Sequence, residues 1–231
     1  MKPTLVLVPG LLCDALVWKH QLAAFADTHE LLVPELSNHT SLEAMASAVL
    51  AAAPSQFALA GHSLGGRIAL EVVRQAPERV THLALMDTGV GPPSPHERDS
   101  RLELVVLGET SGLAAVAERW LPPMLHPARR QEPAFIAPLE AMVAGRTAAS
   151  FRRQQEALLA RPDARPVLGR VHCPTLVLTG REDEWSPPSQ HEAIAAAIPG
   201  AKLVIVPEAG HFAPLEQPEP VTQALRELLA R

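Results

Sequence analysis

Apolar residues along this chain gather in short runs, separated by stretches whose apolar positions repeat every three or four residues. The runs lack the polar alternation of a strand with one wet face, which is typical of strands covered on both faces of a parallel sheet. The pattern therefore predicts strands at Leu5–Val8, Leu31–Val33, Phe57–Ala60, Leu83–Met86, Thr175–Leu178 and Leu203–Val206.

Helical periodicity separates most of these runs. A strand that alternates with a helix indicates a doubly wound α/β domain, with helices on both faces of the sheet. The predicted helices of this layer are Leu16–Phe25, Leu42–Ala53, Gly66–Gln75, Ser189–Ile198 and Val221–Leu229.

Residues 93–170 break the alternation, because they contain no convincing strand and are marked by proline-rich segments such as "LPPMLHP". Long inserts in compact domains are often lids or binding elements. We therefore expect a core of residues 1–92 and 171–231, with a helical lid of residues 93–170 inserted between the fourth and fifth strands. The helices expected in this lid are Leu102–Leu107, Leu113–Trp120, Phe135–Val143 and Ala148–Leu159.

Composition narrows the class of protein. The 231 residues suit one large domain, and a net charge of -5 is too acidic for a general nucleic-acid binder. No apolar run reaches the ~18 residues of a membrane span, and "MKPTLVLVPG" lacks the features of a signal peptide, so we expect a cytoplasmic protein that does not enter a membrane. Cys13 and Cys173 form no CxxC pair, and no histidine or cysteine spacing indicates a metal site or a cofactor.

A serine lies between two glycines where a predicted strand meets a predicted helix. Gly61-His62-Ser63-Leu64-Gly65 matches the G-x-S-x-G nucleophile elbow in the context that this motif requires. Such a tight turn crowds the backbone, and glycine avoids a collision there. The alternative is a plain glycine-rich turn, but the flanking strand and helix favour Ser63 as a nucleophile.

A serine hydroxyl needs a base, which is usually a histidine held by a carboxylate. Among ten histidines, His211 stands out because it follows the last predicted strand. The fifth strand is followed by Glu182, Asp183 and Glu184. The resulting order of serine, acid and histidine is that of α/β-hydrolases.

From Thr4 to about Leu229 the chain resembles the α/β-hydrolase fold family, most closely in "GHSLGG", "PTLVLTGREDEWSPP" and "AGHFAPLEQP". The resemblance implies Asp183 as the acid and His211 as the base. Asp87 is the alternative candidate for the acid, because some members of the family use that position. It also implies six parallel strands in the order 2-1-3-4-5-6, with the first two strands of the family absent.

The resemblance places an oxyanion hole at the backbone N–H groups of Leu11 and Leu64. Fixed donors of this kind stabilise developing negative charge because they do not reorganise. This chain has Pro9-Gly10 where many members have His-Gly, which leaves the backbone donor in place but changes its supporting contacts.

Apolar side chains near these positions and in the lid favour a small or medium hydrophobic ester as substrate. Ordinary core packing is the alternative for each one. The candidates for substrate binding are Leu12, Trp120, Met124, Leu125, Phe135, Met142 and Trp185.

Other activities share these motifs. Hydrolases of carbon–carbon bonds usually carry tryptophan after the base histidine, where this chain has Phe212, and thioester cleavage stays open. The chain also resembles esterases that act on methyl esters held by carrier proteins. The eleven arginines and nine acidic residues of the lid would suit an acidic acyl carrier, although a solvated face explains them more simply. Non-catalytic small-molecule binding on the same fold is the remaining alternative, and the pattern does not indicate an oligomeric state.

Overall fold

The computed structural model describes residues 2–231, and within them the strands form one parallel sheet of six in the order β2-β1-β3-β4-β5-β6. The predicted strand order is therefore confirmed. Each predicted run lies in or overlaps one strand, with ends that differ by up to three residues. The strands are β1 (Thr4–Val8), β2 (Glu30–Leu32), β3 (Phe57–His62), β4 (Val80–Met86), β5 (Thr175–Gly180) and β6 (Lys202–Val206).

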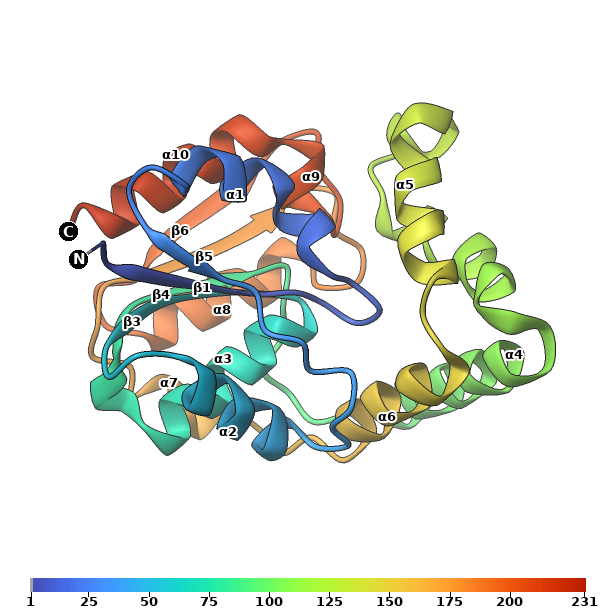
Figure 1. Ribbon diagram of the computed structural model, residues 1–231, viewed down its shortest axis with the longest axis horizontal. Helices are drawn as coiled ribbons and strands as arrows, with labels where there is room; N and C mark the ends of the chain where they lie inside the picture. The colour runs from blue at the N-terminus through green and yellow to red at the C-terminus, as the bar shows by residue number, and fades with distance from the viewer. Residues whose placement is uncertain (1) are drawn as a thin grey trace.

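Helices cover both faces of the sheet (Figure 1). Helices α1 and α10 lie together on one face, and α2, α3 and α8 cover the other. The helices and turns of this layer are η1 (Ala15–Trp18), α1 (Lys19–Phe25), α2 (Leu42–Ala52), α3 (Leu64–Gln75), η2 (Pro77–Arg79), α8 (Pro188–Ala197), α9 (Ala213–Glu216) and α10 (Pro218–Leu229).

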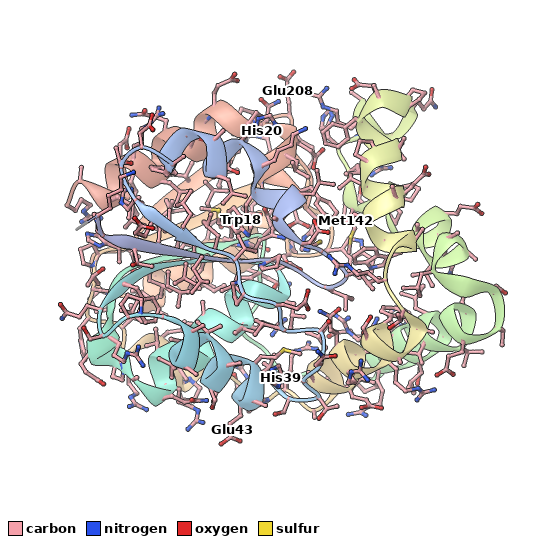
Figure 2. All side chains as sticks on the ribbon, in the orientation of Figure 1. Trp18, His20, His39, Glu43, Met142 and Glu208 are labelled. Carbon is pink, nitrogen blue, oxygen red and sulfur yellow. The ribbon has the colours of Figure 1, made fainter. Side chains whose placement is uncertain are left out.

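The core lies between the sheet and these helices. Leu5 to Val8 of β1 are each no more than 1% exposed, which explains why this strand shows no polar alternation. Burial of one such aliphatic side chain stabilises the fold by about 1.5–3 kcal/mol. Trp18 is buried between the first helical segment and the sheet (Figure 2).

Residues 93–170 are helical in the structure and stand beyond the carboxyl ends of the strands (Figure 1). They connect β4 to β5. Their elements are α4 (Pro95–Trp120), η3 (Pro122–Met124), η4 (Arg129–Gln131), α5 (Pro133–Ala144), α6 (Ala148–Leu159) and α7 (Arg165–Leu168).

The start of α4 corrects the sequence-based prediction, which placed two helices at 102–107 and 113–120. One helix begins at Pro95, because the Ser94 hydroxyl accepts the Glu97 N–H at 3.1 Å and proline suits the first helical position. The expected break survives as a kink at Gly112, whose φ of 82° is not helical.

Candidate active site

Ser63 lies at the turn between β3 and α3, with φ 57° and ψ −115°. A non-glycine residue held in this region costs about 1–3 kcal/mol and marks functional sites. The turn is tight on both sides: a Cβ on Gly61 would lie 2.2 Å from the Gly65 carbonyl oxygen, and one on Gly65 would lie 2.1 Å from the Val8 carbonyl oxygen. The two glycines therefore let the turn close and direct Ser63 out of the sheet.

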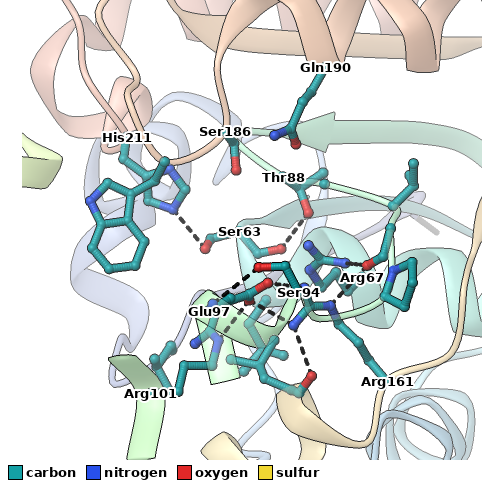
Figure 3. Close-up of a pocket in the computed structure, with 18 of the residues that line it drawn as sticks. Ser63, Arg67, Thr88, Ser94, Glu97, Arg101, Arg161, Ser186, Gln190 and His211 are labelled. Carbon is teal, nitrogen blue, oxygen red and sulfur yellow. Dashed lines mark hydrogen bonds and ion pairs between the residues drawn. The ribbon is translucent and has the colours of Figure 1, made fainter. Parts of the chain in front are cut away.

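His211 and Asp183 meet Ser63 in one line of hydrogen bonds. The Ser63 hydroxyl donates to His211 Nε2 at 2.8 Å (Figure 3), and His211 Nδ1 donates to Asp183 Oδ2 at 2.8 Å. The second carboxylate oxygen of Asp183 accepts the N–H groups of Trp185 and Ser186 at 2.9 and 2.8 Å. The loops after β3, β5 and β6 thus bring together three side chains that lie far apart in the sequence.

The charge of the Asp183 carboxylate is stabilised although the side chain is buried. Burial alone raises its pKa, but the electrostatic interaction and hydrogen bond with His211 and the two backbone N–H groups outweigh burial, so the pKa lies below its ordinary value. An ionised Asp183 can orient the imidazole and stabilise its protonated form.

Asp87 follows β4 and is completely buried, but its carboxylate has other contacts. One oxygen accepts the Gly180 N–H at 2.9 Å, and the other lies 3.8 Å from His62 Nε2. Burial, and next the negative charge of Asp183, raise the pKa of Asp87 well above its ordinary value. Burial and the neighbouring His211 lower the pKa of His62 to about 3, and His62 Nε2 donates to the His211 carbonyl oxygen at 2.6 Å. Asp87 thus faces His62 behind the site, whereas Asp183 faces the His211 ring.

The loop that carries His211 is held by a buried carboxylate. Glu216 accepts the backbone N–H groups of Gly210 at 3.0 Å, Phe212 at 3.2 Å and His126 at 2.7 Å. Burial raises the pKa of Glu216 to about 7 against the opposing effect of these three donors. Glu216 therefore ties the loop on both sides of His211 to the inserted segment, a contact that sequence analysis did not anticipate.

Leu11 and Leu64 lie beside Ser63, and both line the same cavity. The Leu12 N–H donates to Gln154 Oε1 at 3.0 Å and the Cys13 N–H to the Gly10 carbonyl at 3.1 Å. Within residues 2–231 no such acceptor is found for the N–H groups of Leu11 and Leu64. These two donors are therefore free for a ligand oxygen.

A cavity of about 560 Å³ opens above Ser63 between the core and the insertion. Of the apolar candidates, Trp120, Met124 and Trp185 line it. Leu12, Leu125, Phe135 and Met142 do not. Leu12, Leu125 and Met142 are buried in packing, with Met142 on the side of α5 that faces the core (Figure 2), while Phe135 stacks under the Arg129 guanidinium.

Comparison with known proteins identifies the fold family. Residues 5–224 match the family described as "Alpha/beta hydrolase family". The chain belongs to the α/β-hydrolase family.

Relatives of this α/β-hydrolase are enzymes of the same kind. It is 31% identical to the "Putative carbamate hydrolase RutD" of Klebsiella pneumoniae subsp. pneumoniae, over 99% of this chain and 91% of that protein. It is 26% identical to the pimeloyl-[acyl-carrier protein] methyl ester esterase of Nitrosomonas europaea, over 94% and 92%. A solved esterase from Thermogutta terrifontis, with malate bound, superposes with a TM-score of 0.89 at 30% identity, over 99% and 91%. The predicted fold, family and enzymatic nature are thus confirmed.

Charged residues also line the cavity of this α/β-hydrolase, and sequence analysis did not single them out. They are Arg67, Glu97, Arg101 and Arg161, which Figure 3 shows, and Arg165. The only signal in the sequence is the excess of arginine over acidic residues in the insertion. That excess cannot tell a lining residue from a solvated one, because the side chains involved come from α3, α4 and the segment after α6.

Within residues 2–231, no group of three or more His, Cys, Asp or Glu side chains is arranged to hold a metal ion. The helices of residues 2–231 include none with the length and apolar character needed to span a membrane. Cys13 and Cys173 are both free thiols.

Proposed function

We propose that this protein is a serine hydrolase that cleaves carboxylic esters of small molecules, with Ser63 as nucleophile, His211 as base and Asp183 as the orienting acid. The observation that carries the proposal is the unbroken line of two 2.8 Å hydrogen bonds from Ser63 Oγ through His211 to Asp183. The line starts at a strained turn and faces a cavity, which is the geometry of an activated serine.

The proposed reaction begins when Ser63 Oγ attacks the ester carbonyl carbon while His211 Nε2 takes the hydroxyl proton. The tetrahedral oxyanion accepts the N–H groups of Leu11 and Leu64. The carbon–oxygen bond to the alcohol then breaks, and His211 returns its proton to the departing alcohol. Water repeats the sequence on the acyl-enzyme, which releases the acid and restores Ser63.

Residues 93–170 serve in this proposal as a lid that selects the substrate and supplies no member of the triad. Trp120 and Met124 of this segment line the cavity, whereas Ser63, Asp183 and His211 all come from the core. Trp185, from the core, completes the apolar part of the lining.

Two of the similar proteins are named as esterases, which favours esters over other acyl compounds as substrates. One relative is named as a carbamate hydrolase, and the name of the Nitrosomonas protein includes an ester on an acyl-carrier protein. A carbamate and a carrier-bound ester should therefore be tested as substrates as well. Each of these compounds has a carbonyl carbon that Ser63 could attack in the proposed reaction.

A fluorophosphonate probe tests the nucleophile. We expect one label per chain, on Ser63, and no label on Ser63→Ala. A label that persists in the alanine variant would contradict the proposal.

A substrate panel tests the reaction class. We expect turnover of p-nitrophenyl and methyl esters to exceed that of a matched acyl thioester, a carbamate and a vinylogous diketone. The panel includes a methyl ester carried on an acyl-carrier protein beside the same ester free in solution. Cleavage of the diketone without cleavage of any ester would move the protein to carbon–carbon bond hydrolysis.

A further inference from the structure

Three arginines converge on the part of the cavity beyond Ser63. Arg67 is on α3, Arg101 is on α4 and Arg161 follows α6, and one carboxylate, Glu97, lies among them (Figure 3). The side chain of Arg161 is only 2% exposed and that of Arg101 13% exposed. Three guanidiniums thus lie around one carboxylate, and at least two of them are largely buried.

Glu97 has its oxygens occupied by two of these arginines. Arg161 Nη1 and Nη2 donate to its two carboxylate oxygens at 2.8 and 2.6 Å, and Arg101 Nε donates to Oε1 at 2.8 Å. Within residues 2–231 no carboxylate lies within 4.0 Å of Arg67. Arg67 is therefore the cation of the group without an anionic partner.

Arg67 is also held close to a second positive charge. Arg67 Nη1 and Arg161 Nε both donate to the Gly91 carbonyl oxygen, each at 3.0 Å. Two guanidiniums on one acceptor repel each other, and the repulsion is strong where water is scarce. Burial, and next the positive charge of Arg161, lower the pKa of Arg67 to about 9, which still leaves it charged at neutral pH.

A guanidinium carries five N–H groups, and Arg67 donates one of the two on Nη1 to the Gly91 carbonyl oxygen. The Arg67 side chain lines the cavity. The remaining donors have the planar arrangement that binds a carboxylate through two parallel hydrogen bonds. An anion there would offset the repulsion between Arg67 and Arg161.

The position of Arg67 relative to Ser63 and His211 indicates which end of a substrate it would meet. Arg67 lies in the first turn of α3, directly after the turn that carries Ser63, and its backbone N–H donates to the Ser63 carbonyl oxygen at 3.4 Å. Arg67 and Arg161 lie on the other side of Ser63 from His211 (Figure 3). In the proposed reaction the alcohol leaves beside His211, so the acyl part extends toward the arginines.

We propose that the Arg67–Arg161 end of the cavity is a carboxylate-binding subsite, and that the substrates are monoesters of dicarboxylic acids whose free carboxylate binds Arg67. This inference deepens the proposed function and rests on Ser63 as the nucleophile. The alternative is that the three arginines only anchor the insertion to the core. In that case an ester with an acidic acyl group would bind no more tightly than one with a neutral acyl group.

Binding of a product tests the subsite without any turnover. Calorimetry with adipate on the native protein should give a dissociation constant at least about 10-fold lower than that for adipamide, its neutral diamide. Arg67→Gln should weaken adipate binding by about 10-fold or more, whereas Arg74→Gln, an arginine on the same helix that does not line this cavity, should not change it. Equal binding of adipate and adipamide would overturn the subsite, and tighter binding of inorganic phosphate than of adipate would overturn its assignment to carboxylates.

Kinetics then test the preference during the reaction. The native protein should show a kcat/KM for monomethyl adipate at least about 10-fold above that for methyl adipamate, which has an amide in place of the carboxylate. Arg67→Gln should bring this ratio close to one, and Arg67→Lys should retain part of it because the charge remains. A ratio is unaffected by a lower fraction of folded enzyme, so misfolding cannot imitate the result.

The two proposals fail in different ways. If no ester is cleaved and the fluorophosphonate does not label Ser63, the proposed reaction is wrong, and calorimetry with adipate still decides the subsite. If Ser63 is labelled and esters are cleaved with no preference for monomethyl adipate, only the subsite is wrong.

Discussion

The backbone N–H of His211 donates to the carbonyl oxygen of Met124 at 2.7 Å, which joins the loop of the proposed base directly to the insertion. Two residues farther along the insertion, the N–H of His126 donates to Glu216, which also accepts the N–H groups on either side of His211. The position of the imidazole therefore depends on residues of both the core and the insertion.

Glu216→Gln should loosen this connection. A glutamine offers one acceptor oxygen, so at least one of the three backbone N–H groups loses its partner, which costs about 1–3 kcal/mol for a buried donor. We expect a lower unfolding free energy and slower labelling of Ser63 by the fluorophosphonate. Glu219→Gln, an exposed glutamate on α10, is the matched control and should change neither.

The cost of Glu216→Gln should depend on pH. The pKa of Glu216 is raised from 4.5 to about 7 in the folded chain, so its protonated form stabilises the fold below pH 4.5, and that contribution is lost as pH rises toward 7. The whole difference corresponds to about 3 kcal/mol. Chemical denaturation at pH 5 and pH 8 should therefore show a smaller gap between native protein and variant at pH 8. A gap that widens with pH would mean that the carboxylate is ionised in the folded chain at pH 5.

Asp183→Asn should lower kcat on the order of 10⁴-fold if the carboxylate holds the tautomer and orientation of His211. Asp87→Asn is the matched control, because Asp87 lies on the neighbouring loop and contacts Gly180 and His62 instead. Glu182→Gln and Glu184→Gln should also change kcat little. A large loss with Asp87→Asn and none with Asp183→Asn would transfer the role of the acid to Asp87.

Trp120→Ala should change which acyl chains are preferred, because Trp120 lines the cavity. A series of p-nitrophenyl esters of rising chain length should shift its optimum toward longer acyl groups, while a small fluorophosphonate still labels Ser63. Phe135→Ala is the control within the same insertion, since Phe135 does not line the cavity. A folded Trp120→Ala protein that resists the small probe would contradict the proposed division between lid and triad.

Gly65→Ala should destabilise the fold by several kcal/mol, because the new Cβ would lie 2.1 Å from the backbone oxygen of Val8, which a strand holds in place. Gly169→Ala has no atom within 4 Å of its new Cβ and a φ of −68°, so its unfolding free energy should stay close to that of the native protein. Thermal denaturation of the pair measures the difference. Equal melting temperatures would show that the elbow can relax around a side chain.

The sheet could be predicted from the amino-acid pattern alone. Runs such as Leu5–Val8 and Phe57–Ala60 are apolar without alternation, and in the structure the strands that contain them are covered on both faces. The nucleophile elbow could be predicted from the sequence as well, because strand, turn and helix are local and glycine is required where the turn crowds the backbone. The start of α4 was not predicted because Ser94, which caps the helix, lies in a proline-rich segment that is typical of a loop.

The sequence could also place candidates at the ends of strands, but it could not decide between Asp87 and Asp183 by pattern alone, since each follows a strand. In the folded chain Asp183 faces the His211 ring and Asp87 faces His62, and this difference follows from how the strands and loops pack. The orientation depends on backbone geometry after each strand, including the left-handed φ of 48° at Asp87, which no periodicity reports.

The arginines of the cavity were decided by tertiary structure alone. Arg67 belongs to a core helix, while Arg101 and Arg161 belong to an insertion, and the sequence separates the first and last by more than ninety residues. In the sequence each arginine is compatible with a solvated surface, because a long charged side chain satisfies the same pattern at a helix surface and at a cavity wall. Packing of the insertion over the carboxyl ends of the strands buries much of these side chains and brings three separate charges to the wall of one cavity.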